Sequence, residues 1–128
     1  MHRLLSRLVC CAFAASLCLL AAQGRAESRQ VFAHVFTVPT VLPEGASASA
    51  RQRELEAWLS ATFGGFTCLG RGTGGWKNEE GRVETQDNVV YLVTAGRDVS
   101  KAIAEKLRAD FGERAPYVLV IPAGQFVP

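Results

Sequence analysis

The order of apolar patterns along the chain is the feature that most constrains its fold. Two segments carry apolar residues three and four positions apart, which is typical of amphipathic helices. Four others are rich in valine, phenylalanine and threonine, which favour strands. In chain order, the strand, helix, strand, strand, helix and strand segments cover residues 30–38, 49–63, 66–72, 82–94, 99–111 and 117–121.

This order predicts an α+β fold of the ferredoxin-like type, in which two strand–helix–strand units share a central hairpin. Because such crossovers are right-handed, both helices should lie on one face of a four-stranded antiparallel sheet. The first and third strands should be central, flanked by the fourth and the second. The other sheet face then has no helix from this chain to cover it, and a second subunit is one candidate for that cover.

Local signals set the expected ends of these elements. Ser49 and Gln52 fit a capping box at the start of the first helix, since each can bind a free backbone N–H. Asp98 can cap the second helix. Between the second and third strands, Asn78 and Gly81 stand at the two ends of a four-residue turn, which indicates a hairpin.

Residues 1–26 have the three-part layout of a secretory signal peptide. A start with two arginines and no acid is followed by a run of 15 apolar or small residues, Leu8 to Ala22. The small residues Gly24 and Ala26 then stand three and one positions before a possible cut after Ala26. The run is shorter than the roughly 20 residues that a membrane-spanning helix needs. We therefore expect cleavage after Ala26, one domain over residues 27–128, and a periplasmic or secreted protein with no stable membrane anchor.

Cleavage would change the cysteine count and the charge. Three of the four cysteines lie in the leader, so the mature chain keeps only Cys68, which we expect to be a small buried residue of a strand. Losing three arginines lowers Lys plus Arg from 14 to 11, against 12 Asp plus Glu, a net charge of −1. This balance argues against nucleic acid or an anionic membrane as a partner.

The glycine-rich stretch from Gly70 to Trp76 contains the spacing G-x-G-x-x-G. A nucleotide-binding loop needs these glycines between a strand and the start of a helix. Here a polar turn follows instead, so we expect no nucleotide and no other cofactor. The glycines are expected to let the strand bulge or approach another backbone closely.

The same region resembles a pattern in small exported bacterial proteins of uncharacterised function. The matching residues are Phe63-Gly64-Gly65-Phe66-Thr67, then Gly70 and Gly72, then Gly75-Trp76, then Gly81-Arg82. In those proteins a helix ending in F-G-G-F/L-T is paired with a glycine–tryptophan strand and a polar hairpin. The resemblance covers roughly residues 55–84. It agrees with the expected fold and implies no catalytic residues.

The best candidate for a contact surface is an aromatic side chain flanked by basic ones on the hairpin. Trp76 and Lys77 precede the turn, Arg82 follows it, and Arg71 lies earlier in the same strand. Tryptophan and arginine are over-represented among the residues that dominate binding. These four residues are therefore candidates for contact with a ligand or partner, and the alternative is that Trp76 packs onto its own sheet.

His34 is the one histidine left after cleavage, and it shares a strand face with Phe32 and Phe36. Most histidines in such a position are buried and hydrogen-bonded, although a general base, a metal ligand or a contact to a bound ligand is an alternative. No second histidine or cysteine pair has the spacing of metal ligands, so we expect no metal site. No serine or threonine lies in a nucleophile motif.

These observations favour an exported, non-catalytic binding or accessory protein, whose partner is a protein or a small ligand. One alternative is a sheet-to-sheet dimer, an enzyme or a small-ligand binder, with a pocket around His34. Another is an inhibitor or immunity-type protein that acts on a second exported protein. Whether the chain has catalytic activity stays open at this point, with the balance against it.

Overall fold

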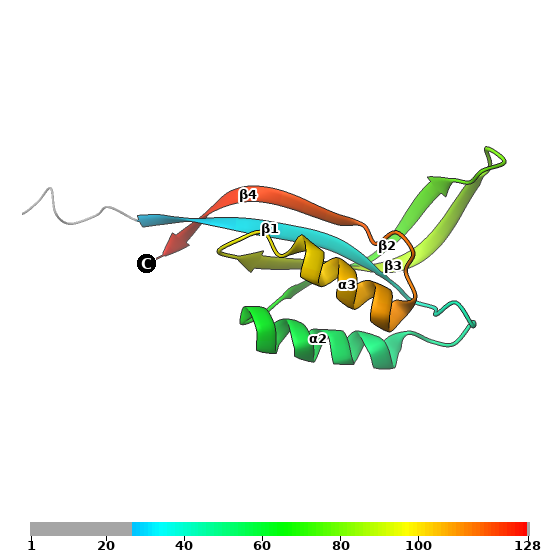
Figure 1. Cartoon of the computed structure of the whole chain (residues 1–128), viewed down its shortest axis with the longest axis horizontal. Helices are drawn as coiled ribbons and strands as arrows, with labels where there is room; N and C mark the ends of the chain where they lie inside the picture. The colour runs from blue at the N-terminus through cyan, green and yellow to red at the C-terminus, as the bar shows by residue number, and fades with distance from the viewer. Residues whose placement is uncertain (1–26, 128) are drawn as a thin grey trace, which may run out of the picture. The chain divides into compact units, whose positions relative to one another are not determined.

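A computed structural model describes residues 27–127, so the predicted signal peptide lies outside the described residues. Residues 30–124 form one compact unit, and the described residues at the two ends belong to a second one. The elements are β1 (Glu27–Pro39), α2 (Ser49–Phe63), β2 (Thr67–Lys77), β3 (Val83–Ala95), α3 (Ser100–Phe111) and β4 (Val118–Val127) (Figure 1).

The four strands form one sheet in the order β2-β3-β1-β4. Strand β3 pairs antiparallel with β1 on one side and with β2 on the other. Both helices lie against the same face of the sheet (Figure 1). The predicted α+β class, with a four-stranded antiparallel sheet and two helices, is confirmed and is consistent with a ferredoxin-like arrangement.

The hydrophobic core fills the space between the helices and the sheet. Successive side chains of a strand point to opposite faces, and the pairing of β1 with β3 puts Phe36 beside Tyr91 on the helix side. Their rings stack with centroids 5.7 Å apart. The helices add their apolar stripes to this layer: Leu55 and Leu59 from α2, and Ile103, Leu107 and Phe111 from α3. Full burial of each such side chain stabilises the fold by roughly 1.5–3 kcal/mol.

The start of α2 differs from the predicted capping box. The helix begins at Ser49 itself, with Ala48 in the capping position and no side-chain cap. Ser49 is thus already helical, and its own N–H donates to the hydroxyl of Ser47 at 3.3 Å. The amide of Gln52 instead donates to the carbonyl of Pro39 at 3.0 Å, which ties the first turn of the helix to the end of β1.

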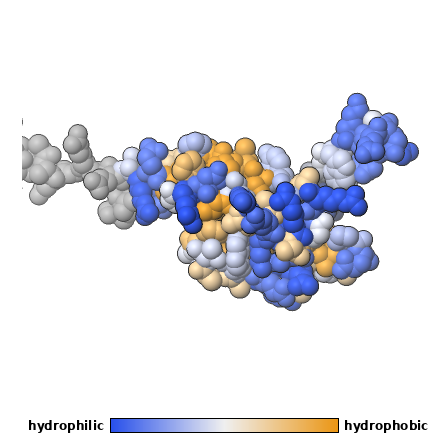
Figure 2. All heavy atoms as spheres, in the orientation of Figure 1, coloured by the Kyte–Doolittle hydropathy of each residue, from blue (hydrophilic) through white to orange (hydrophobic). Residues whose placement is uncertain are grey.

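The hairpin between β2 and β3 has the predicted turn. The N–H of Gly81 donates to the carbonyl of Asn78 at 3.0 Å, and the Asn78 side chain accepts the N–H of Arg82 at 2.8 Å. Gly81 has a φ of 79°, which favours glycine. The side chains at this tip are hydrophilic (Figure 2).

The glycine-rich stretch lies inside β2 rather than between a strand and a helix, so it does not form a phosphate-binding loop. The register shifts between Cys68 and Gly70, and Gly70 has a φ of 112°. The predicted bulge is therefore confirmed, with Leu69 as the extra residue.

Candidate binding pocket

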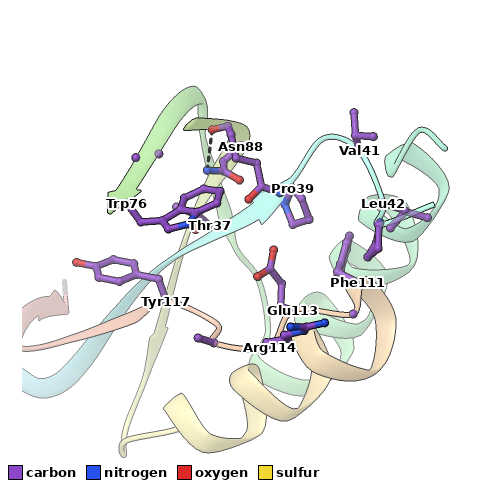
Figure 3. Close-up of a pocket in the computed structure, with 16 residues that line it drawn as sticks. Thr37, Pro39, Val41, Leu42, Trp76, Asn88, Phe111, Glu113, Arg114 and Tyr117 are labelled. Atoms are coloured by element: carbon purple, nitrogen blue, oxygen red, sulfur yellow. Dashed lines mark hydrogen bonds between the residues drawn. The ribbon is translucent and has the colours of Figure 1, made fainter. Parts of the chain in front are cut away.

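A pocket of about 1000 Å³ lies at one end of the sheet, where the uncovered face meets the loops that follow β1 and α3 (Figure 3). Its volume is at the upper end of the range usual for small-molecule sites. The lining comes from β1, β2, β3, the last residue of α3 and both loops: Thr37, Pro39, Val41, Leu42, Pro43, Gly74, Gly75, Trp76, Gln86, Asn88, Phe111, Gly112, Glu113, Arg114, Ala115 and Tyr117.

Two large aromatic side chains line the pocket and stay accessible. Trp76, near the end of β2, is 47% exposed, and Tyr117, just before β4, is 59% exposed. In Figure 3 both rings lie on the same side of the pocket. Aromatic rings of this size usually become buried in a core or in a contact, so their exposure here marks a surface suited to binding.

The glycines of β2 make room in the pocket wall. Gly74 lies opposite Gln86 in the sheet, and a Cβ on Gly74 would come within 2.8 Å of the Asn88 side-chain nitrogen. That nitrogen donates to the Gln86 carbonyl at 3.2 Å. The Asn88 amide is nearly buried at 8% exposure, so the missing side chain at position 74 is what lets it pack against β2.

Glu113 is the one acidic side chain of the pocket lining. Its carboxylate points into the pocket (Figure 3). Burial raises the pKa of the Glu113 carboxyl above its usual value, because a charge is less well solvated there. Within residues 27–127, no hydrogen bond or ion pair is made to this carboxylate.

The structure does not bring the four predicted hairpin residues together. Trp76 faces the pocket side of the sheet, whereas Arg71 and Lys77 pair with residues whose side chains point to the opposite side. Arg82 lies at the turn, where its guanidinium is 3.1 Å from the carboxylate of Glu80. Strand alternation separates them, because odd and even positions after the bulge fall on opposite faces. Only Trp76 of this group lines the pocket.

His34 lies on the helix-covered side of the sheet and is fully buried. Its Nε2 accepts the backbone N–H of Val99 at 3.0 Å, and an Asp98 carboxylate oxygen lies 3.3 Å from the same nitrogen. Nε2 is therefore the acceptor of the Val99 N–H, while the other ring nitrogen, Nδ1, is buried without a hydrogen-bond partner among the described residues. A pocket around His34 is therefore not formed, and this histidine holds β1 to the start of α3.

Three further findings concern the described part of the chain. No group of three or more histidine, cysteine, aspartate or glutamate side chains there could hold a metal ion. None of its helices has the length and apolar character to cross a membrane. Cys68 is exposed, which corrects the expectation of a buried cysteine, because it lies in the outer strand β2.

The sequence alone did not identify Glu113, Tyr117 and Asn88 as pocket residues. The only sequence feature that could have indicated a site there is the segment from Gly112 to Tyr117. It has a charged residue directly after the glycine that ends the helix, and then a proline and an aromatic residue. Such a loop can belong to any surface. Its place in the same pocket as Trp76 is visible only in the three-dimensional structure, because β2 and β4 are the two outer strands of the sheet.

The chain matches no protein-family model and no curated protein. Fifteen chains of solved structures are similar to it. One is the crystal structure of a Bacillus cereus protein related to NIF3, with a TM-score of 0.55, 13% identity and coverage of 76% of this chain. This chain spans 26% of the length of that protein. At this identity the likeness concerns the fold alone.

Proposed function

We propose that this chain is a small, non-catalytic binding protein whose ligand occupies the pocket beside Trp76. The observation that carries the proposal is the convergence of two exposed aromatic rings with a few polar groups around one pocket. Ligand sites commonly combine an apolar wall with a small number of oriented polar groups. Here Asn88 and Gln86 supply amides, and Thr37 supplies a hydroxyl.

The arrangement of reactive side chains supports binding rather than catalysis. His34, the sole histidine among residues 27–127, is buried against the helices and already accepts a backbone hydrogen bond. The pocket lining contains neither cysteine nor serine, and the hydroxyl of its one threonine, Thr37, makes no hydrogen bond to another lining side chain. A nucleophile normally needs a base within hydrogen-bond reach.

The pattern of residues 1–26 supports export to the periplasm or the medium, with cleavage after Ala26. The ferredoxin-like assignment is part of the same proposal, and the strand order supports it. N-terminal sequencing of the protein from the cell envelope and from the medium tests the export step. A chain that still begins at Met1 in the cytoplasm would contradict it.

Binding can be tested with a small fragment library, followed by two-dimensional amide NMR spectra of the purified protein. Fragments of cationic, neutral and anionic type are included. We expect the bound fragments to shift the indole N–H of Trp76 and the side-chain amides of Asn88 and Gln86. Trp58 is an internal reference, because it packs against Phe63 on α2, with ring centroids 5.2 Å apart.

The same spectra separate binding from catalysis. Fragments should be recovered unchanged after long incubation. If no fragment shifts the pocket resonances, or if the shifts centre on Trp58, the pocket proposal is wrong. If a bound fragment is converted to product, the non-catalytic part is wrong.

A protein partner or a second copy is a further candidate function, favoured by apolar residues on the edge strand β4. Leu119 is 43% exposed and Ile121 42% exposed. Figure 2 shows hydrophobic side chains gathered over the middle of β4 and β1. Sedimentation of the purified protein at several concentrations tests the homodimer, and a monomer at all concentrations would leave only a different protein, such as an exported target, for this surface.

A further inference from the structure

We propose that the ligand of this pocket carries an organic cation, an ammonium group, which binds between the Glu113 carboxylate and the rings of Trp76 and Tyr117. This inference rests on the proposed binding function and specifies the chemistry of the ligand. A compact ammonium compound such as choline represents the class.

The first argument is geometric. Glu113 follows the glycine that ends α3, and its side chain points into the pocket from the α3–β4 loop (Figure 3). Trp76 and Tyr117 line the same pocket from β2 and from the chain just before β4. A carboxylate together with aromatic faces is a typical environment for an ammonium group, because the face of each ring carries negative electrostatic potential.

The second argument concerns the charge of Glu113. Its carboxylate is partly withdrawn from water, and no cation of residues 27–127 lies within ion-pair distance of it. Burial raises the pKa of the Glu113 carboxyl, and no ion pair with a cation of the described residues lowers it again. An ionised group in this position is less favourable for the folded protein than an amide would be. A cationic ligand would supply the missing partner.

The other titratable or charged side chains of the pocket are Arg114 and Tyr117, whereas β1, β2 and β3 contribute none. Arg114 is exposed and makes no ion pair with Glu113 among the described residues. It therefore leaves the carboxylate free for a ligand. An anionic ligand at Arg114 would leave Glu113 unpaired and would meet its negative charge.

The test compares three probes by titration of the purified protein, followed through the Trp76 indole N–H. The probes are choline, its neutral isostere in which carbon replaces the ammonium nitrogen, and acetate. We expect choline to bind about tenfold more tightly than the isostere, which corresponds to a cation–ring and carboxylate contribution of about 1.4 kcal/mol. Acetate should not shift the Trp76 resonance.

Two variants with the same change of net charge sharpen the test. Glu113→Gln should reduce choline affinity about tenfold and leave that of the neutral isostere unchanged. Glu79→Gln, which alters an exposed residue of the hairpin turn, should change neither. Choline affinity of the unmodified protein should also fall as Glu113 becomes protonated, beginning at a pH above the usual glutamate range, and Glu113→Gln should remove this pH dependence.

The outcomes separate the two proposals. If the neutral isostere or acetate shifts Trp76 as strongly as choline does, the pocket binds ligands but the cation inference is wrong. If none of the probes and no library fragment shifts the pocket, the binding function itself fails. The probe comparison uses the unmodified protein, so it decides the question even if a variant does not fold.

Discussion

The two faces of the sheet have opposite surroundings, although the same strands build both. On one face, α2 and α3 pack over Phe36 and Tyr91, and those side chains are almost completely buried. On the other face no helix of residues 27–127 covers the sheet, and Trp76 and Tyr117 stay accessible at the pocket (Figure 3). Because successive side chains of a strand point to opposite faces, a shift of one residue moves a side chain from the helix-covered face to the uncovered face.

The difference shows why residue type alone is a poor guide to function in this chain. His34, the residue with the most versatile chemistry, lies on the covered face and has a backbone partner. Glu113, an ordinary loop glutamate by sequence, lies in the pocket without one. A carboxylate that lines a pocket without a protein partner is accessible to a ligand, whereas a histidine buried under the helices is not.

The largest predicted effect comes from truncating equivalent leucines on the two faces. Leu59→Ala, in the core between α2 and the sheet, should lower the free energy of unfolding by about 2–5 kcal/mol, because a fully buried side chain leaves a cavity. Leu119→Ala, on β4, should lower it by only about 1 kcal/mol, because this side chain is 43% exposed. Urea unfolding of both variants measures the contrast.

A large loss of stability for Leu119→Ala would break this contrast. It would mean that a second copy covers the β4 surface in solution. Repeating the Leu119→Ala unfolding experiment at two protein concentrations identifies that case, because the stability of a dimer depends on concentration and that of a monomer does not.

The next effect in size concerns His34. His34→Ala should lower the free energy of unfolding by about 2–4 kcal/mol, because the buried N–H of Val99 loses its acceptor and a cavity remains. His34→Gln should recover part of this loss, since the amide oxygen can accept the same N–H. The affinity for choline should be equal in the unmodified protein and in His34→Gln.

An unchanged stability in His34→Ala would show that the histidine does not hold β1 to the start of α3. A reduced choline affinity in His34→Gln, measured where this variant is fully folded, would contradict the separation of the two faces. His34 would then again be a candidate for contact with the ligand.

The fold was predictable because its signals are local. The stripe from Val99 to Phe111 and the alternation around Tyr91 each repeat several times, so one irregular position does not hide them. The predicted capping box was wrong because the helix begins one residue earlier than expected. Ala48, and not Ser49, stands in the capping position. Gln52 found a partner in Pro39, which is thirteen residues away and belongs to another element.

The site was much less predictable because its members come from distant parts of the sequence. Trp76 was identified from its own neighbourhood, but its basic neighbours Arg71 and Lys77 point to the other side of the sheet. The bulge at Leu69 sets that alternation, and only the strand pairing locates the bulge. Glu113 belongs to no sequence motif. Its role is proposed from the pocket residues around it, Trp76 and Tyr117, which are distant from one another in the sequence.

The smallest predicted effect compares two carboxyl groups whose pKa values are shifted in opposite directions. The N–H of Ser100 donates to Asp98 at 2.8 Å and, together with the Ser100 hydroxyl, lowers the pKa of this carboxyl below its ordinary value of 3.8. Its contribution to stability should be complete above that ordinary value and should disappear as the pH falls through the lowered pKa. Glu113 has a raised pKa, so its ionisation should disfavour the folded state as the pH rises.

Thermal unfolding from acid to neutral pH measures both signs. At neutral pH, Asp98→Ala should melt slightly below the unmodified protein, and this difference should vanish in strong acid. Glu113→Gln should melt at or slightly above it at neutral pH. Because His34 lies 3.3 Å from Asp98, the Asp98 comparison is repeated with His34→Gln in both proteins. Melting curves that shift in the same direction for both carboxyl groups would show that Glu113 has a stabilising partner in the folded protein, and the case for a cation supplied by a ligand would then be lost.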